Sequence, residues 1–132
     1  MDNSSQINRQ AGKAYLSERV QQFSSRITEY TRPTYNETEV RVDFVNPFFK
    51  ALGWDVDNEA GMPDHLREVT HEAAVKVEEN GRQRSKKPDY SFRVGTETFF
   101  YLETKKPSVD ITSDCAPAFQ LRRYGWSGNL KI

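Results

Sequence analysis

The chain has 132 residues, enough for one domain with a modest core. Its 19 basic and 19 acidic residues cancel, so net charge gives no argument for a nucleic-acid partner. The single cysteine excludes an intramolecular disulfide and a cysteine zinc cluster. With no long apolar run and no signal-peptide pattern, a soluble intracellular protein without membrane contact is expected.

The N-terminal part predicts a disordered segment followed by a helix. Residues 1–10 are polar and expected to be disordered, which leaves 11–132 as the folded domain. From Ala11 to Tyr30, apolar residues recur at spacings of three and four: Leu16, Val20, Phe23, Ile27 and Tyr30. This periodicity indicates an amphipathic helix packed on the core, with a partner-binding helix as the alternative.

A second helix is predicted from Asn36 to Leu52, with Gly53 as its stop. Its inward positions are Val40, Phe44, Val45, Phe48 and Leu52. Pro47 lies inside this stretch, so a kink or a fresh first turn is expected there. Thr34 to Glu37 also fits a capping box, which gives Glu37 a purely structural interpretation.

Short strands are predicted next, at Trp54–Val56 and Glu68–Val77, with a turn at residues 78–81. The following segment is basic, with Arg82, Arg84, Lys86 and Lys87, and is either a solvated loop or a set of DNA phosphate contacts. A helix is predicted over Ser113–Tyr124. A strand beginning at Asn129 runs into the end of the sequence, which suggests a larger parent protein.

Residues 88–105 read as a β-hairpin whose arms are rich in aromatic and β-branched residues. Glu103 and Lys105 share a face because side chains alternate along a strand. A two-residue turn at Gly95-Thr96 would put Asp89 opposite Leu102, on the wrong face. A three-residue turn, 95–97, pairs Asp89 with Glu103, and further along it pairs Ser91 with Tyr101 and Arg93 with Phe99. Only this register separates an apolar face from a face that ends in charges, so we predict it.

Two carboxylates and an ammonium at one point suit phosphodiester hydrolysis. Carboxylate oxygens are the ligands that Mg²⁺ prefers, and it takes only one or two of them from a protein. The metal polarises the phosphoryl oxygen, while a neighbouring ammonium orients water or stabilises the developing charge. Asp89 and Glu103 are therefore candidate metal ligands, and Lys105 is a candidate catalytic residue.

Pro88-Asp89 and Glu103-x-Lys105 on a hairpin resemble the motif of the PD-(D/E)xK nuclease superfamily. The block from Asn36 to Asp55 is similar to the N-terminal endonuclease domains of restriction enzymes, namely Type I motor subunits and single-chain Type IIG enzymes. Gln120 and Tyr124 resemble the Gln-x-x-x-Tyr helix motif of recombination nucleases. The resemblance covers residues 36–126.

The resemblance implies an α/β fold with a restriction-endonuclease-like core: a mixed central sheet with a catalytic β-hairpin, flanked by helices. It implies a Mg²⁺-dependent DNA endonuclease, with Mn²⁺ as a substitute ion, in a prokaryotic cytoplasm. Glu37 matches the glutamate that completes the metal site in that group. Gln120, Tyr124, Lys87 and Lys106 are candidate supporting or DNA-contacting residues.

The implied partners are double-stranded DNA and the recognition, methyltransferase or translocase domains of a parent protein, with dimerisation on DNA a further hypothesis. Three alternatives stay open: a repair or recombination nuclease of the same fold, a nucleic-acid-binding module that does not cut, and a protein-interaction domain that uses the helix of residues 11–30.

Overall fold

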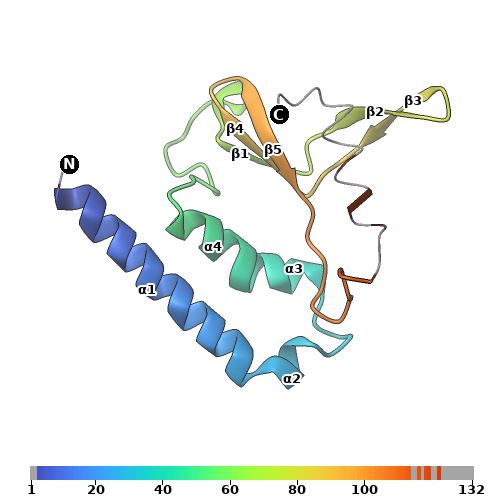
Figure 1. Ribbon diagram of the computed structural model, residues 1–132. Coiled ribbons are helices and arrows are strands. Elements are labelled where there is room, and N and C mark those ends of the chain that lie inside the picture. Colours follow the sequence, from blue (N-terminus) through green and yellow to red (C-terminus); the bar gives the residue numbers. More distant parts are fainter. Residues whose placement is uncertain (1–2, 114–115, 117, 120–121, 123–132) are drawn as a thin grey trace. The chain divides into compact units, whose positions relative to one another are not determined.

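The computed structural model describes residues 3–113, 116, 118, 119 and 122 (Figure 1). The chain divides into two compact units, which we describe separately. The first comprises Met1–Trp54 and Lys105–Val109, and the second comprises Asp55–Thr104 and Asp110–Ile132. Within the described residues, no helix has both the length and the apolar character needed to cross a membrane.

The first unit begins with α1, Asn3–Ser25. This helix starts eight residues before the predicted start at Ala11, so residues 3–10 are helical where disorder was expected. Extending an existing helix fixes one residue for each new hydrogen bond, so polar turns can continue it without an apolar face. Of the predicted inward positions, Leu16 and Phe23 are half-buried and Tyr30 is buried, as expected, whereas Val20 is 66% and Ile27 50% exposed.

An aromatic cluster forms the core of this unit. It joins α1 to the short helix α2, Ile27–Tyr30, and to the residues that follow. Tyr30 is 4% exposed, stacks on Phe23 at 5.6 Å, and meets Tyr35 and Phe44 edge to face at 5.0 and 4.9 Å. Its hydroxyl accepts a 2.7 Å hydrogen bond from Gln22 Nε2. Aromatic pairs in these geometries add to the stabilisation that burial gives.

The predicted second helix is divided into α3 (Glu37–Val40), the π-helix η1 (Arg41–Val45) and α4 (Asn46–Ala51). The prediction of a fresh turn at Pro47 is confirmed, since this proline lies in the first turn of α4. Proline has no N–H and its ring clashes with the carbonyl four residues earlier, so a wider π turn before it relieves the conflict.

Gly53 ends α4 as predicted, with φ of 100°. Its N–H bonds the carbonyl of Lys50 at 2.9 Å and the N–H of Trp54 bonds Phe49 at 3.0 Å, the pattern of a Schellman motif. Two of the predicted inward positions are wrong, because Phe48 is 42% and Leu52 55% exposed. Periodicity was extrapolated across η1, where the wider π turn rotates the following residues around the helix axis.

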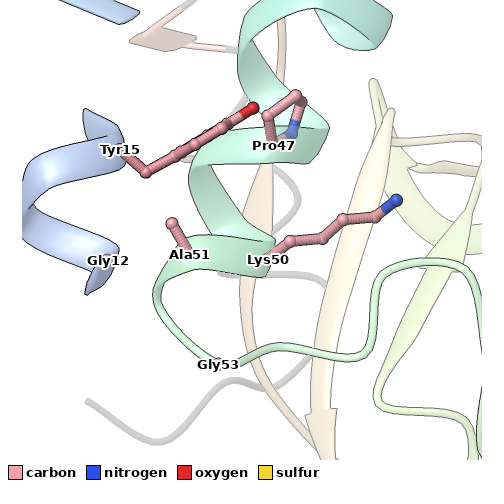
Figure 2. A pocket seen from close by; sticks show the side chains of 6 residues that line it. All are labelled: Gly12, Tyr15, Pro47, Lys50, Ala51 and Gly53. Carbon is pink, nitrogen blue, oxygen red and sulfur yellow. The ribbon is translucent and has the colours of Figure 1, made fainter. Parts of the chain in front are cut away.

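α1 packs against α4 at Gly12. A Cβ built on Gly12 would lie 2.8 Å from the carbonyl oxygen of Ala51, so only glycine permits this approach. Figure 2 shows the pocket beside this contact, of about 560 Å³, with Tyr15 of α1 reaching toward Pro47 of α4. The glycine therefore sets the distance between the two helices.

The second unit opens with a loop where a strand was predicted. Trp54–Val56 is not a strand, although Val56 is buried. Asp55 instead accepts hydrogen bonds from the N–H groups of Glu59 and Ala60, at 2.8 and 3.1 Å. Side chains of this type compete with sheet formation by bonding nearby backbone, which explains the error. A 3₁₀ turn, η2, follows at Asp64–Leu66.

The predicted strand Glu68–Val77 is in fact two strands in different sheets. β1 is Val69–His71 and β2 is Val75–Glu79. Between them Glu72 has φ of 53°, a left-handed conformation that no continuous strand allows. Valines on both sides made the segment look like a single strand, whereas the break depends on one backbone angle.

β2 forms a hairpin with β3, Arg82–Lys86, in a two-stranded antiparallel sheet. The predicted turn is confirmed: Asn80 and Gly81 both have positive φ, 53° and 74°, as a type I′ turn requires. The basic segment, left open between a loop and a phosphate-contacting element, is a strand whose first four residues are exposed.

The three-stranded sheet has the order β1-β4-β5, with β4 at Tyr90–Val94 and β5 at Glu97–Leu102. One face is apolar: Val69, Phe92 and Phe100 stand side by side across the strands, and the Phe92 and Phe100 rings stack at 4.4 Å. In the described residues β5 is an edge strand and β4 is the buried one. β5 is not buried on both faces, since Phe99 is 51% exposed.

The fold class is borne out at its coarser level, as helices and a sheet are both present. Every strand ladder among the described residues is antiparallel, so the mixed sheet is not seen in that part of the chain.

Candidate active site

The hairpin of β4 and β5 aligns Asp89 with Glu103, by a route that differs from the prediction. Tyr90 pairs with Leu102, so the next residues outward are Asp89 and Glu103. The predicted pairing of Ser91 with Tyr101 is confirmed.

The predicted three-residue turn and the pairing of Arg93 with Phe99 are wrong. The turn has two residues, Gly95 and Thr96, with Gly95 at φ 61°. Arg93 pairs with Thr98, and a bulge leaves Phe99 as an extra residue in β5. Because a bulge shifts register by one, the shorter turn plus the bulge gives the same alignment as the longer turn.

Asp89 is fixed by Thr104. Asp89 is 9% and Thr104 5% exposed. Oδ2 of Asp89 accepts a 2.8 Å bond from the Thr104 backbone N–H and a 2.7 Å bond from its hydroxyl. The Asp89 carbonyl also accepts a 3.2 Å bond from Glu72 N–H. Hydrogen bonds from a buried residue hold a carboxylate in one orientation, as a metal ligand requires.

Glu103, next to Thr104, is partly buried at the end of β5. Across the described residues, no three His, Cys, Asp or Glu side chains are close enough together to hold a metal ion on their own. Mg²⁺ usually takes only one or two protein carboxylates and keeps several waters. Two aligned acids, one of them fixed, therefore suit the ion by ligand type, although a three-carboxylate cage is not formed.

Glu37 and Lys105 meet within the first unit. Lys105 Nζ lies 3.9 Å from Glu37 Oε1, and both side chains are partly exposed. A pair of this kind adds at most about 1 kcal/mol to stability, so it orients the two groups more than it stabilises the fold.

The capping interpretation of Glu37 is wrong. Asn36 is the N-cap of α3, and Glu39 completes the capping box, with bonds of 2.9 and 2.8 Å. The N-cap is Asn36, two residues after the predicted cap at Thr34. Glu37 is therefore the first residue of the helix, and the third, Glu39, returns the hydrogen bond to the cap. The structural role is filled by Glu39, and Glu37 contacts Lys105.

The candidate DNA-contacting residues divide into described and undescribed ones. Lys87 is exposed after β3, and Lys106 is half-buried beside Lys105. Gln120 and Tyr124 lie outside the described residues, as do Cys115 and the strand predicted from Asn129. Of the helix predicted over Ser113–Tyr124, the described residues 116, 118, 119 and 122 are helical.

Thr104 is the site residue that the sequence did not single out. It lies between the two charged residues of Glu103-x-Lys105, and strand alternation alone assigns it to the opposite face. The chain leaves β5 after Leu102, so alternation no longer applies at Thr104. The signal in the sequence that could have identified Thr104 is its hydroxyl group, because Thr104 directly follows Glu103, the residue aligned with Asp89.

Comparison of amino-acid sequences finds a similarity to one restriction enzyme. Over 120 residues, 91% of its length, the chain is 45% identical to part of the Type II restriction enzyme and methyltransferase RM.Eco57I of Escherichia coli. The chain spans 12% of that protein. No protein-family model matches the chain. No solved structure matches it either. The similarity supports the coarser expectation, a domain of the kind found in a restriction enzyme.

Proposed function

We propose that the chain is the DNA-cleaving domain of a restriction-modification enzyme and that it hydrolyses phosphodiester bonds with Mg²⁺. The observation that carries the proposal is the hairpin register, which aligns Asp89 with Glu103, two residues before Lys105. The identity with a segment of a restriction enzyme and methyltransferase adds support from outside the site.

Asp89 and Glu103 would hold the ion, and Glu37 would contribute directly or through a water molecule. When bound, Mg²⁺ would polarise the phosphoryl oxygen and lower the pKa of a coordinated water. Thr104 would keep the Asp89 carboxylate from turning away, through its two hydrogen bonds. Mn²⁺ would substitute for Mg²⁺, because both ions accept carboxylate and water oxygens.

Lys105 would orient the attacking water or stabilise charge on the phosphoryl oxygens. Its ammonium is already held by Glu37 at 3.9 Å, which limits the positions that the long side chain can sample. Glu37 therefore has a second route of influence, through Lys105, whether or not it touches the ion.

Double-stranded DNA would be held mainly through its phosphates. β3 offers three cations over five residues with no acidic residue among them, and Lys87 follows it directly. Lys106, Gln120 and Tyr124 would add contacts. The recognition, methyltransferase or translocase parts would belong to a parent protein, and two copies would dimerise on DNA to cut both strands.

Mn²⁺ binding tests the site without requiring a recognition partner. Electron paramagnetic resonance would count bound Mn²⁺ for the full chain and for Asp89→Asn and Glu103→Gln, with the fully exposed Asp64→Asn as the matched control. We expect a saturable site that either site variant weakens at least about tenfold and the control leaves unchanged. Anomalous diffraction from Mn²⁺-soaked crystals would locate the ion.

Failure of the full chain to take up Mn²⁺ would overturn the nuclease proposal. If such a protein still bound duplex DNA through β3, a module that binds without cutting would replace it. Equal Mn²⁺ affinity in Asp89→Asn and in Asp64→Asn would show that the ion lies elsewhere.

A further inference from the structure

A second pocket, of about 370 Å³, lies in the second unit on the polar face of the three-stranded sheet. Three hydroxyl residues form a row across this face, which we call the hydroxyl row: Thr70 of β1 pairs with Ser91 of β4, and Ser91 pairs with Tyr101 of β5. Cross-strand partners project from the same face, so the register directs all three to this side.

The lining of the pocket is suited to an anion. Besides the hydroxyl row it includes Thr96, Thr98 and the cations Lys76 and Arg93, while its described lining contains no carboxylate. Arg93 donates to the backbone carbonyls of Asp64 and His65, which fixes its guanidinium and leaves its charge in place. A pocket that has several hydroxyl groups and two positive charges attracts phosphate more strongly than a neutral ligand.

One member of the hydroxyl row is buried without a partner. Thr70 Oγ1 has no hydrogen-bond partner among the described residues, a state that costs free energy unless a ligand satisfies it. Ser91, between Thr70 and Tyr101, is 5% exposed, so its position is fixed by packing.

The pocket lies one strand step from the candidate active site. Asp89 lies just before β4, two residues from Ser91, and Glu103 lies just after β5, two residues from Tyr101. Two residues along a strand span about 6.6 Å. A polynucleotide carries a phosphate on every nucleotide, so a strand lying across Asp89 would bring a neighbouring phosphate to the hydroxyl row.

We propose that this pocket binds the backbone phosphate next to the one that is cleaved, with the hydroxyl row donating to its oxygens and Lys76 supplying the opposite charge. The proposal rests on the proposed nuclease function for its ligand, a DNA phosphodiester. It assigns Thr70, Ser91, Tyr101 and Lys76 a positioning role, distinct from metal binding.

Inorganic phosphate is the probe for the test. Heteronuclear NMR of the full chain, titrated with phosphate at constant ionic strength, should shift the amide signals of Thr70, Ser91 and Tyr101 saturably. Tyr101→Phe and Thr70→Val each remove one hydroxyl and little volume, and each should weaken phosphate binding about tenfold. Tyr15→Phe, in the other pocket, is the matched control and should bind as the unsubstituted chain does.

Duplex DNA supplies the second readout, with Ca²⁺ in place of Mg²⁺ to prevent cutting. Lys76→Gln should lower the slope of log affinity against log salt by about 0.9, the value for one lost phosphate contact. Lys13→Gln, exposed on α1, is the control for loss of a charge elsewhere.

Asp89→Asn separates this proposal from the nuclease proposal. Phosphate shifts that persist in Asp89→Asn, and that need a higher phosphate concentration in Tyr101→Phe, support the pocket even if Mn²⁺ binding fails. Absence of saturable shifts in the full chain overturns the pocket even if Mn²⁺ binds and DNA is cut. Shifts that survive unchanged in both hydroxyl variants would equally overturn the assignment.

Discussion

Replacing Thr104 by valine tests whether its hydroxyl, as the geometry indicates, fixes Asp89. Valine has the shape of threonine but cannot donate, so Asp89 loses the 2.7 Å bond and keeps the 2.8 Å bond from the Thr104 N–H. Hydrogen bonds to charged groups contribute about 1.5–3 kcal/mol, and both residues are buried. We therefore expect Thr104→Val to lower the free energy of unfolding by about 2 kcal/mol.

Urea unfolding followed by circular dichroism measures this change, with the slope against urea expected to stay constant. Thr104→Ser is the internal control, because it keeps the donor and loses one methyl group, which costs about 0.8 kcal/mol. Thr28→Val, on an exposed residue of α2, should be close to neutral. In the Mn²⁺ assay, Thr104→Val should bind more weakly than Thr104→Ser.

The opposite ranking would refute the reasoning. If Thr104→Ser is less stable than Thr104→Val, then the methyl group matters through packing and the hydroxyl does not fix Asp89. If both variants match the unsubstituted chain in stability and in Mn²⁺ affinity, then the hydrogen bonds have no role in the site.

Three further predictions follow from the core, the helix contact and one exposed carboxylate. Phe92→Ala should lower the free energy of unfolding in urea by about 3–5 kcal/mol, because Phe92 is fully buried and stacks with Tyr90 and Phe100. Phe99→Ala, at the exposed bulge, should lower it by less than about 1 kcal/mol. Equal losses in the two variants would contradict the faces assigned to these residues. Gly12→Ala should destabilise the fold by about 1 kcal/mol or more despite the better helix propensity of alanine, because the new Cβ would lie 2.8 Å from the Ala51 carbonyl oxygen. Ser17→Ala, at an exposed position of the same helix, is the control and should not destabilise it. Equal stability of the two variants would exclude the close contact. Hydrogen bonds from the Thr112 and Ser113 hydroxyls lower the pKa of Asp110 from 3.8 to about 2. The contribution of Asp110 to stability is therefore present above pH 3.8 and is lost as the pH falls toward 2. NMR titration of the carboxyl carbon should give a midpoint near 2, and a midpoint near 3.8 would show that these hydrogen bonds do not form in solution.

Local patterns correctly predicted several elements. The glycine stop of α4, the Asn80-Gly81 turn and the restart at Pro47 depend on backbone preferences of one or two residues, and these preferences act within a few bonds. The helical periodicity of the N-terminal segment predicted a helix and the inward positions Leu16, Phe23 and Tyr30, but Val20 and Ile27 are exposed. Which apolar positions are covered depends on the packing of α1 against α4 and α2, which the sequence of α1 alone does not contain.

The errors concern backbone angles and cooperation between distant segments. A left-handed Glu72 splits Glu68–Val77 into strands of different sheets, and glutamate gives no warning of that conformation. Trp54–Val56 has strand-like composition, but Asp55 satisfies neighbouring N–H groups itself. In each case a single residue overrides a pattern that its neighbours establish.

The sequence by itself determined which residues share a face of the hairpin, and hence that Asp89 aligns with Glu103, because strand alternation is local and only one register segregates apolar from charged side chains. Only the tertiary structure decided how that register is reached, with the bulge at Phe99, and which contacts fix the charged groups. Thr104 bonds Asp89 across 15 residues, and Lys105 meets Glu37 from another part of the chain. Such contacts form only when distant segments pack together, so no local preference encodes them.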